Sequence, residues 1–282
     1  MSIVRAAVAA ATTAAAVTAV GRRALGATLG GSPRWTRVNH RGAPISLLEG
    51  PAVAAGLVAG ALAGGRSGSR EALAGAVAAA GGATFGLVDD LSEDVSRTRK
   101  GLRGHLGALA HGELTTGGLK VLGIGATGVV ASALALERGT TGRVAHAIDV
   151  LCAGALVAGT ANLVNLLDLR PGRALKAGAL LAAPALVTAG APAAAAALGA
   201  AGAALPRDLG EQDMLGDGGA NALGAIVGTA LVLGTPRPVR AALLAAVVGL
   251  TLASERVSFT AVIARTPALR ALDEWGRRRD RA

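Results

Sequence analysis

The chain has 282 residues, of which 52% are hydrophobic and only 1% aromatic, with 42 glycines and a formal net charge of +10. Soluble globular domains do not have this composition, so an ordinary soluble enzyme is excluded. The positive charge does not indicate a nucleic-acid partner, because the basic residues are spread over alternate loops and stacking aromatics are nearly absent. Anionic lipid headgroups and anionic substrates explain the charge better.

Nine apolar runs recur along the chain, separated by short segments that hold most of the charges. They cover residues 6–20, 51–64, 72–88, 121–136, 144–164, 174–189, 191–205, 219–234 and 239–253. Several are shorter than the roughly 20 residues that a bilayer core requires, but their number indicates a polytopic membrane protein. We therefore predict an all-α fold, a membrane helix bundle of about nine transmembrane helices in residues 1–253, with a cytoplasmic C-terminal segment in residues 254–282.

The basic residues also predict an orientation, because positively charged loops stay in the cytoplasm. With the N-terminus outside, about three quarters of the 28 Lys and Arg residues fall in inside segments. This favours an N-out, C-in protein of the cell membrane. Residues 1–20 are interpreted as the first span and not as a signal peptide, because Arg22 and Arg23 follow directly, as in a cytoplasmic flank.

The third run ends in FGLVDDLSED, with Asp89 and Asp90 side by side. Two adjacent carboxylates at a helix C-terminus lie against the negative end of the helix dipole and repel each other, so a cationic group should compensate them. A solvated helix end with ordinary surface acids is the alternative. The position at the membrane boundary, where acids are costly and more often functional, favours a site.

The fifth run ends in NLVNLLDLRPGRALK. Asn162, Asn165 and Asp168 are spaced at i, i+3 and i+6, so in a helix they share one broad face. All three carry oxygen atoms, which are the ligands that magnesium prefers. A stripe of two amides and one acid in an Ala/Leu/Val environment is hard to explain as packing.

The eighth run begins in DMLGDGGANALG, where glycines flank Asp217. Glycine lets a backbone approach a ligand closely, and a helix N-terminus offers free N–H groups to phosphate oxygens. Glu211 and Asp213, just before, are interpreted as ordinary loop acids. Counting the crossings places all three motifs on the same, cytoplasmic face of the membrane.

In this order, the motifs resemble those of the polyprenyl-phosphate N-acetylhexosamine-1-phosphate transferases, the family of the MraY and WecA types and of the dolichol-phosphate enzyme. NHRGAPISLLEG looks like the first cytoplasmic loop of that family, and GLVDDL like its Asp-Asp motif. NLVNLLDLRPG looks like Asn-x-x-Asn-x-x-Asp-Gly-x-Asp-Gly, and MLGDGGANALG like Met-Gly-Asp-x-Gly-Ser-x-x-Leu-Gly. Together the matches cover most of the chain.

The resemblance implies that a polyprenyl phosphate attacks the sugar-side phosphorus of a UDP-sugar, and that UMP is released. It implies magnesium, with Asp217 as the main ligand supported by Asn165 and Asp168. Asp89 is then the base or the acid that positions the nucleophile, with Asp90 beside it. The candidate substrate-binding residues are Asn162, Asn165, Gly218 and the basic residues Lys120, Arg41 and Arg103. The sequence does not decide whether the protein forms a homodimer.

Departures from the family pattern support a second reading. Leu169 and Pro171 stand where the family has Gly and Asp, and Met214 replaces an aromatic residue. The family's C-terminal histidine-rich loop and tenth span are missing; of the four histidines, His105 and His111 are best explained as solvated loop residues. The alternative is a non-catalytic relative that binds lipid phosphate or UDP-sugar as a regulator or scaffold. A transporter is disfavoured, because its polar groups would lie at mid-membrane.

The C-terminal segment contains the pattern of a short interfacial helix over residues 266–277. Thr266 followed by Pro267 is a typical helix start. Leu269, Leu272 and Trp275 recur at intervals of three and give one apolar edge, with charged residues elsewhere. The segment is too short and too charged to span a membrane, so we expect it to lie in the headgroup region and close the cytoplasmic site. A disordered basic tail is the alternative.

Overall fold

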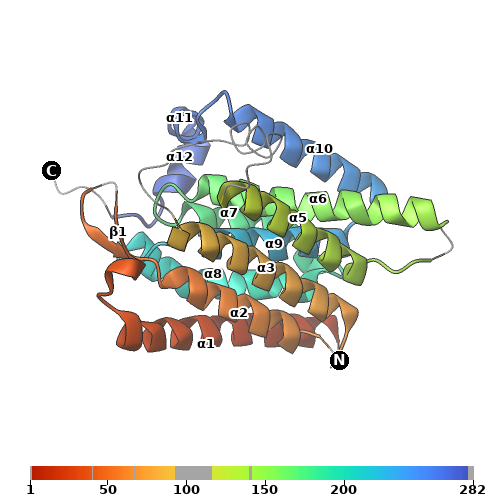
Figure 1. The fold of residues 1–282 in the computed structure, drawn as a ribbon, viewed down its shortest axis with the longest axis horizontal. Helices are drawn as coiled ribbons and strands as arrows, with labels where there is room; N and C mark the ends of the chain where they lie inside the picture. Colours follow the sequence, from red (N-terminus) through yellow and green to blue (C-terminus); the bar gives the residue numbers. More distant parts are fainter. Residues whose placement is uncertain (1, 40, 66–67, 93–115, 140–141, 279–282) are drawn as a thin grey trace.

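The computed structural model describes residues 2–39, 41–65, 68–92, 116–139 and 142–278, and the described chain is almost entirely helical (Figure 1). The elements up to residue 92 are α1 (Ile3–Leu29), η1 (Pro33–Trp35), β1 (Thr36–Val38), β2 (Pro44–Ser46), α2 (Glu49–Ala63) and α3 (Arg70–Ser92). The later ones are α5 (Thr116–Ala135), α6 (Arg143–Leu167), α7 (Arg173–Ala182), η2 (Ala183–Val187), α8 (Ala191–Leu209), α9 (Gly216–Gly234), α10 (Arg237–Ser254), α11 (Phe259–Arg265) and α12 (Pro267–Glu274).

The all-α prediction is confirmed in the described residues, where β1 and β2 form a single antiparallel pair. Six of the described helices, α1, α3, α5, α6, α9 and α10, are long and apolar enough to cross a membrane. This marks the chain as a membrane protein. The other three predicted spans are also helical but are not among these six: α2 has only 15 residues, α7 gives way to η2 near Pro184, and α8 is long enough with 19 residues but not apolar enough. The number nine therefore stays a prediction.

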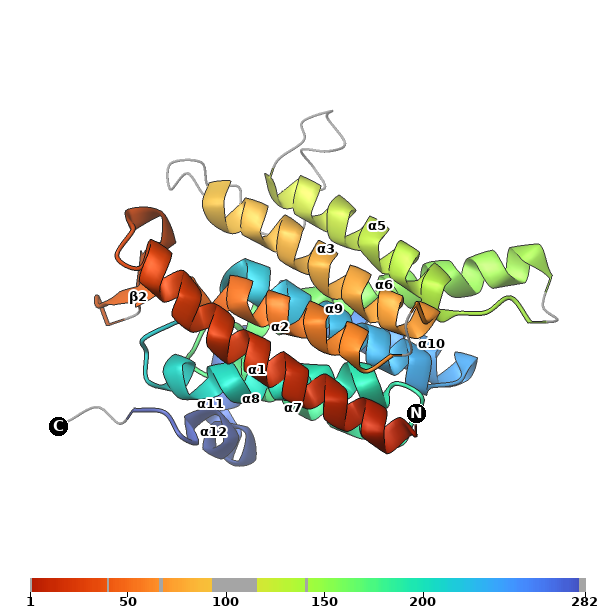
Figure 2. The ribbon, with the colours of Figure 1, turned by 90° about the horizontal axis from the view of Figure 1, so that it is seen from below.

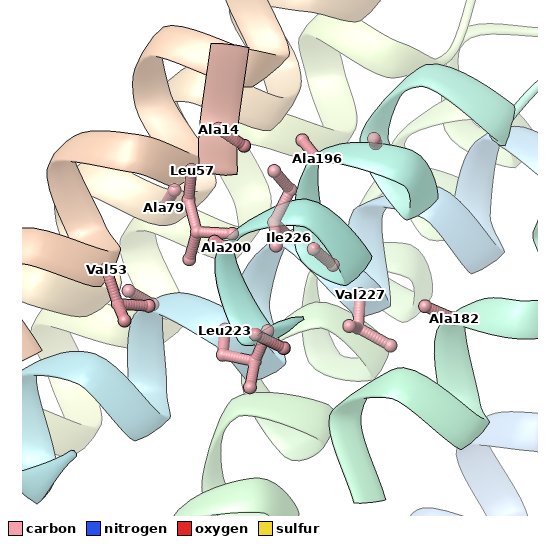
Figure 3. Close-up of a cluster of buried hydrophobic side chains, with 14 of the residues drawn as sticks. Ala14, Val53, Leu57, Ala79, Ala182, Ala196, Ala200, Leu223, Ile226 and Val227 are labelled. Atoms are coloured by element: carbon pink, nitrogen blue, oxygen red, sulfur yellow. The ribbon is translucent and has the colours of Figure 1, made fainter. Parts of the chain in front are cut away.

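The helices lie side by side with α9 near the centre (Figures 1 and 2). α9 is buried along nearly its whole length by α2, α3 and α6, while α1 packs along α2 and α8. The core combines many alanines with a few larger side chains, among them Leu57, Leu223 and Ile226 (Figure 3). Small residues allow helices to approach closely in lipid, which explains why a chain so poor in aromatics packs well.

The closest approach joins α3 to α9. A Cβ atom on Gly86 would lie 2.3 Å from the carbonyl oxygen of Asp217, and one on Gly82 would lie 2.7 Å from that of Asn221. No side chain fits at either position, because such contacts are far inside van der Waals distance. The glycines of α3 therefore set the end of this helix directly beside the beginning of α9.

The C-terminal segment folds as two short helices at the same end of the bundle as β1, opposite the N-terminus (Figure 1). The segment is helical as α12, which begins at Pro267 as predicted but ends at Glu274, before the predicted limit of 277. Its place in the headgroup region and its closure of the site stay predictions. Leu269 and Leu272 line an apolar cavity of about 570 Å³ between α6, α7, α10, α11 and α12. Trp275 follows the helix and is exposed.

A buried ion pair holds α12 against α7. Arg173 donates to both carboxylate oxygens of Asp273, at 2.7 and 3.1 Å, and Lys176 donates to three backbone carbonyls at the end of α12. Burial alone would raise the pKa of Asp273, but its hydrogen bonds and charge attraction with Arg173, and with Arg277 and Lys176, hold the pKa below its ordinary value. The pair therefore stabilises the docked helix at neutral pH.

We predict that Asp273→Asn releases α12 from α7, because it leaves the buried guanidinium of Arg173 uncompensated, at a cost of about 3 kcal/mol. The wild-type contribution should persist down to about pH 4 and disappear below it, since the pKa of Asp273 is lowered from an unfolded value of about 3.9. Limited proteolysis of the C-terminal segment in detergent measures the release. Glu274→Gln, on the exposed side of the same helix, is the matched control, and equal protease resistance of both variants would contradict the prediction.

Candidate functional site

Asp90 caps the N-terminus of α9 from another helix. α9 has no side-chain cap of its own: Leu215 is its N-cap residue, and Gly216 follows with a left-handed φ of 63°. The carboxylate of Asp90 accepts the N–H groups of Asp217 at 3.1 Å and of Gly218 at 2.9 Å. A negative charge is favourable here because the free N–H groups and the helix dipole both attract it. The capping carboxylate thus fixes the backbone on which Asp217 is carried.

Asp89 and Asp217 meet at one lysine. The ammonium of Lys120, near the start of α5, donates to Asp89 at 3.2 Å and also to Asp217. This is the cationic compensation that the Asp-Asp motif requires, and it comes from the next helix along the chain. All three side chains are partly exposed, with 25% of the Asp89 side chain accessible. The group of Asp89, Asp90, Asp217 and Lys120 is called the Lys120 cluster below.

Asp168 lies close enough to the Lys120 cluster to feel its charges. It is the C-cap residue of α6 and has left the helical conformation, with ψ of 48°. Burial raises the pKa of its carboxyl well above the ordinary value, and the charges of Asp208 and Asp217 raise it further, while a backbone hydrogen bond from Gly216 opposes them. The carboxyl is therefore held toward its protonated form, and a cation bound nearby would favour its ionisation.

The two asparagines of α6 face different surroundings. The Asn162 amide lies 3.4 Å from the Thr251 hydroxyl, which is a long contact, and Asn162 lines a groove with Lys120. The side-chain oxygen of Asn165 is buried without a hydrogen-bond partner among the described residues. Because Asp168 has left the helix, the predicted stripe of three residues on one face does not continue to its end.

The groove beside Lys120 runs between α5, α6, α9 and α10 and has a volume of about 260 Å³. Its polar lining consists of Lys120, Asn162, Asn221 and Thr251, and the remainder is Val121, Ile124, Ala158, Gly159, Val247, Val248 and Leu252. The side-chain oxygen of Asn221 is buried and has no hydrogen-bond partner in the described structure. The groove therefore has a polar head at the Lys120 cluster and apolar walls beyond it.

Two predicted substrate contacts are engaged elsewhere in the structure. The N–H of Gly218 is taken by Asp90, and a Cβ there would lie 2.6 Å from Leu87, so this glycine serves helix packing and not an open ligand surface. Arg41 forms an ion pair with Glu211 at 3.3 Å, and its N–H bonds to Asn39. Arg103, His105 and His111 lie outside the described residues.

Asp213 is not the ordinary loop acid that the sequence suggested. It is fully buried and accepts hydrogen bonds from Arg22 of α1 and Arg207 of α8. The loop around it is pinned to β2, since Met214 donates to the carbonyl of Ser46 at 2.9 Å. Asp213 therefore holds the entry to α9 in place. Its neighbour Glu211 is tied to the β1–β2 turn through Asn39 and Arg41.

Sequence reasoning also missed Arg37 and Asn221. Arg37 of β1 donates to the backbone carbonyl of Asp90 and so attaches the strand pair to the end of α3. The amide of Asn221 donates to the carbonyl of Asp217 at 2.7 Å, one turn into α9. A signal for Asn221 was present, because it stands four residues after Asp217 and shares its helix face.

Magnesium is implied by the resemblance, and the geometry can be tested for it. Among the described residues, no three His, Cys, Asp or Glu side chains are grouped so that they could hold a metal ion by themselves. Magnesium, however, is usually bound through one or two carboxylates together with substrate phosphates. Asp89 and Asp217 already converge on one cation, the Lys120 ammonium. This pair fits a magnesium ion that arrives with a diphosphate.

No protein-family model matches the chain, and no curated protein matches it. The resemblance to the sugar-phosphate transferases therefore rests on the order and content of the motifs alone. The contacts among the motif residues bring Asp89, Asp90 and Asp217 together around Lys120, with Asp168 close by.

We predict different consequences for the two adjacent aspartates. Asp90→Asn should lower the free energy of unfolding by about 1–2 kcal/mol, because an amide group would face one of the two N–H groups that the carboxylate accepts. Asp89→Asn should change stability by less than about 1 kcal/mol, since it removes only a partly exposed ion pair. Thermal unfolding in detergent measures both. A larger loss in the Asp89 variant would refute the assignment of Asp90 as the cap.

Proposed function

We propose that the protein transfers a sugar 1-phosphate, of the N-acetylhexosamine type, from a UDP-sugar to a polyprenyl phosphate in the synthesis of a cell-envelope polymer. A phosphate oxygen of the lipid forms a bond to the sugar-side phosphorus of the UDP-sugar. The bond from that phosphorus to the bridging oxygen breaks, and UMP leaves with that oxygen. The products are UMP and a lipid-linked diphosphate sugar.

The observation that carries the proposal is the Lys120 cluster at the head of an apolar groove. Two carboxylates from different helices share one ammonium there, next to the two further acids Asp90 and Asp168. Both substrates are phosphate anions that repel each other, so the reaction needs cations and alignment more than covalent chemistry from the protein. A site with several carboxylates and a lysine is suited to collect those cations.

The groove supports a lipid as the acceptor. The ammonium of Lys120 and the amides of Asn162 and Asn221 line its polar head, where a phosphate would be held. Beyond them the walls are apolar side chains of α5, α6 and α10, which a prenyl chain would contact without cost to polar groups. A soluble acceptor would gain nothing from these walls.

The residues then have the following roles. Asp217 and Asp89 would hold a magnesium ion, with Asn165 and Asp168 in support, and such an ion would neutralise charge on the diphosphate. Asp89 also accepts a proton from the lipid phosphate or orients it. Lys120 moves from the carboxylates to the phosphates. Asp90 positions Asp217 by capping α9, and Gly218 contributes through the same cap.

The proposal includes nine spans with the N-terminus outside and the site on the cytoplasmic face of the cell membrane. The support is the distribution of charge, together with the contacts that join the ends of α3 and α6 to the beginnings of α5 and α9. A cytoplasmic site has access to nucleotide-activated sugars.

The second candidate is a relative that binds lipid phosphate or UDP-sugar without turnover. One observation favours it: the acids of the Lys120 cluster are paired internally, since Lys120 neutralises Asp89 and Asp217, and backbone N–H groups neutralise Asp90. Pro171, in place of the second acid of the third motif, agrees with this candidate.

The test is release of UMP by the purified protein with polyprenyl phosphate, magnesium and a panel of UDP-sugars. We expect turnover with at least one UDP-N-acetylhexosamine, and loss of turnover of about a hundredfold or more in Asp217→Asn, as typical for a group that stabilises charge in the transition state. Glu211→Gln, an acid in the preceding loop, is the control. Binding without UMP release would support the second candidate, and wild-type rates in Asp217→Asn would remove Asp217 from the site.

The orientation predicts which loops react with an impermeant thiol reagent. In a Cys152→Ala background, a cysteine at position 92, at the end of α3, should be protected in intact cells, and one at position 67 should be labelled. The physical reason is the excess of Lys and Arg on the side of residue 92. Labelling of position 92 together with protection of position 67 would show that the orientation is the opposite of the predicted one.

A further inference from the structure

A second polar cavity lies between α1, α2 and α8. It has a volume of about 290 Å³, near the lower limit for small-molecule sites, and is called the α1–α8 pocket. Its lining is Thr18, Ala19, Arg22, Arg23, Glu49, Ala203, Ala204 and Arg207. Arg22 and Arg23 follow the apolar part of α1, so the pocket lies at the depth of lipid headgroups. Figure 2 shows α1 lying along α2 and α8 at the surface of the bundle.

The inner wall of this pocket consists mainly of hydrogen-bond acceptors. Glu49 is only 1% exposed, and its carboxyl hydrogen-bonds to the carboxyl of Asp208, so one proton is shared between two acids. A carboxyl pair that shares one proton keeps a negative charge and acceptor atoms without a donor. The hydroxyl of Thr18 is buried and has no hydrogen-bond partner within the described chain. Buried polar atoms are nearly always satisfied, so this wall is suited to a cationic ligand with several donors.

The outer wall has the opposite character. Arg22 and Arg207 share a single carboxylate, that of Asp213, so this part of the wall keeps a positive charge. Arg23 lies exposed on the neighbouring position of α1 and adds a second one. Guanidinium groups at this depth are suited to a phosphodiester. The pocket therefore presents an anion-binding rim above a base that accepts hydrogen bonds.

We propose that the α1–α8 pocket binds the headgroup of an ethanolamine phospholipid, with the phosphodiester on Arg23 and Arg207 and the ammonium on Glu49 and Thr18. A primary ammonium supplies three donors and a positive charge to the carboxyl pair. A choline headgroup has the same charges but no N–H group, and a glycerol headgroup has no cation. Neither can therefore bind the arginine rim and also donate hydrogen bonds with a positive charge to the inner wall. This proposal does not rest on the proposed transfer reaction.

The experiment is lipid binding to the intact, detergent-solubilised protein, measured by native mass spectrometry with phosphatidylethanolamine, phosphatidylcholine and phosphatidylglycerol of identical chains. We expect the ethanolamine lipid to bind about tenfold or more tightly than the choline lipid, as for loss of hydrogen bonds to a charged group. Glu49→Gln should abolish this preference. Arg23→Gln, at an exposed position, should weaken binding of the ethanolamine lipid, whereas Arg5→Gln near the other end of α1 should not.

Several outcomes would overturn the proposal. Equal binding of the ethanolamine and choline lipids, or an unchanged preference in Glu49→Gln, would show that the carboxyl does not recognise an ammonium. Tightest binding of phosphatidylglycerol would indicate a general anionic site. Competition by soluble phosphoethanolamine at the same concentration as the lipid would assign the pocket to a free metabolite instead of a lipid.

Discussion

The contact between the end of α3 and the beginning of α9 is the constraint on which the rest of the site depends. Gly82 and Gly86 let the two helix backbones approach closely, and Asp90 then reaches the free N–H groups of Asp217 and Gly218. Because one aspartate is used as the cap, its neighbour Asp89 and the capped residue Asp217 are presented side by side. Lys120 bridges these two carboxylates.

The electrostatics of the site follow from this geometry. The acids Asp89, Asp90, Asp168 and Asp217 lie close together, and Lys120 is the cation that contacts two of them. Carboxylates grouped in this way repel each other, which is one reason why the pKa of Asp168 is raised. Perturbed carboxyl groups of this kind are common at functional sites, although ion pairs that only stabilise a fold also perturb pKa values.

Much of the fold could be predicted from the sequence. Each apolar run is a helix, and the crossing count correctly brought the three motifs to one end of the bundle. The number of spans was less predictable, since α7 ends after 10 residues, before Pro184, and the alanine-rich α8 is long enough but not apolar enough to be counted among the candidate spans. The apolar edge of α12 was visible, but its partner was not. Nothing local in the sequence shows that Asp273 would be buried against Arg173, 100 residues away.

Some features of the site could likewise be predicted from the sequence, and others could not. Asp89, Asp90, Asp168, Lys120 and Asp217 could be chosen because charged residues at the ends of apolar runs are rare and costly. The different roles of Asp89 and Asp90 could not be predicted, because they depend on how α3 meets α9. Glycines beside Asp217 suggested access for a ligand, whereas Gly218 is packed against Leu87. Asp213 and Glu49 look like loop acids in the sequence. Their burial could not be predicted, because it depends on α1 and α8, which are distant in the chain.

The central claim is that motifs far apart in the sequence form one site through Lys120. A double-mutant cycle with Lys120→Met and Asp217→Asn, read as free energies of unfolding in detergent, measures this most directly. We predict a coupling energy of about 1 kcal/mol or more, with the double variant more stable than the sum of the single losses implies, because each single variant leaves a charge without its partner. Additivity of the two single losses to within about 0.3 kcal/mol would contradict the account.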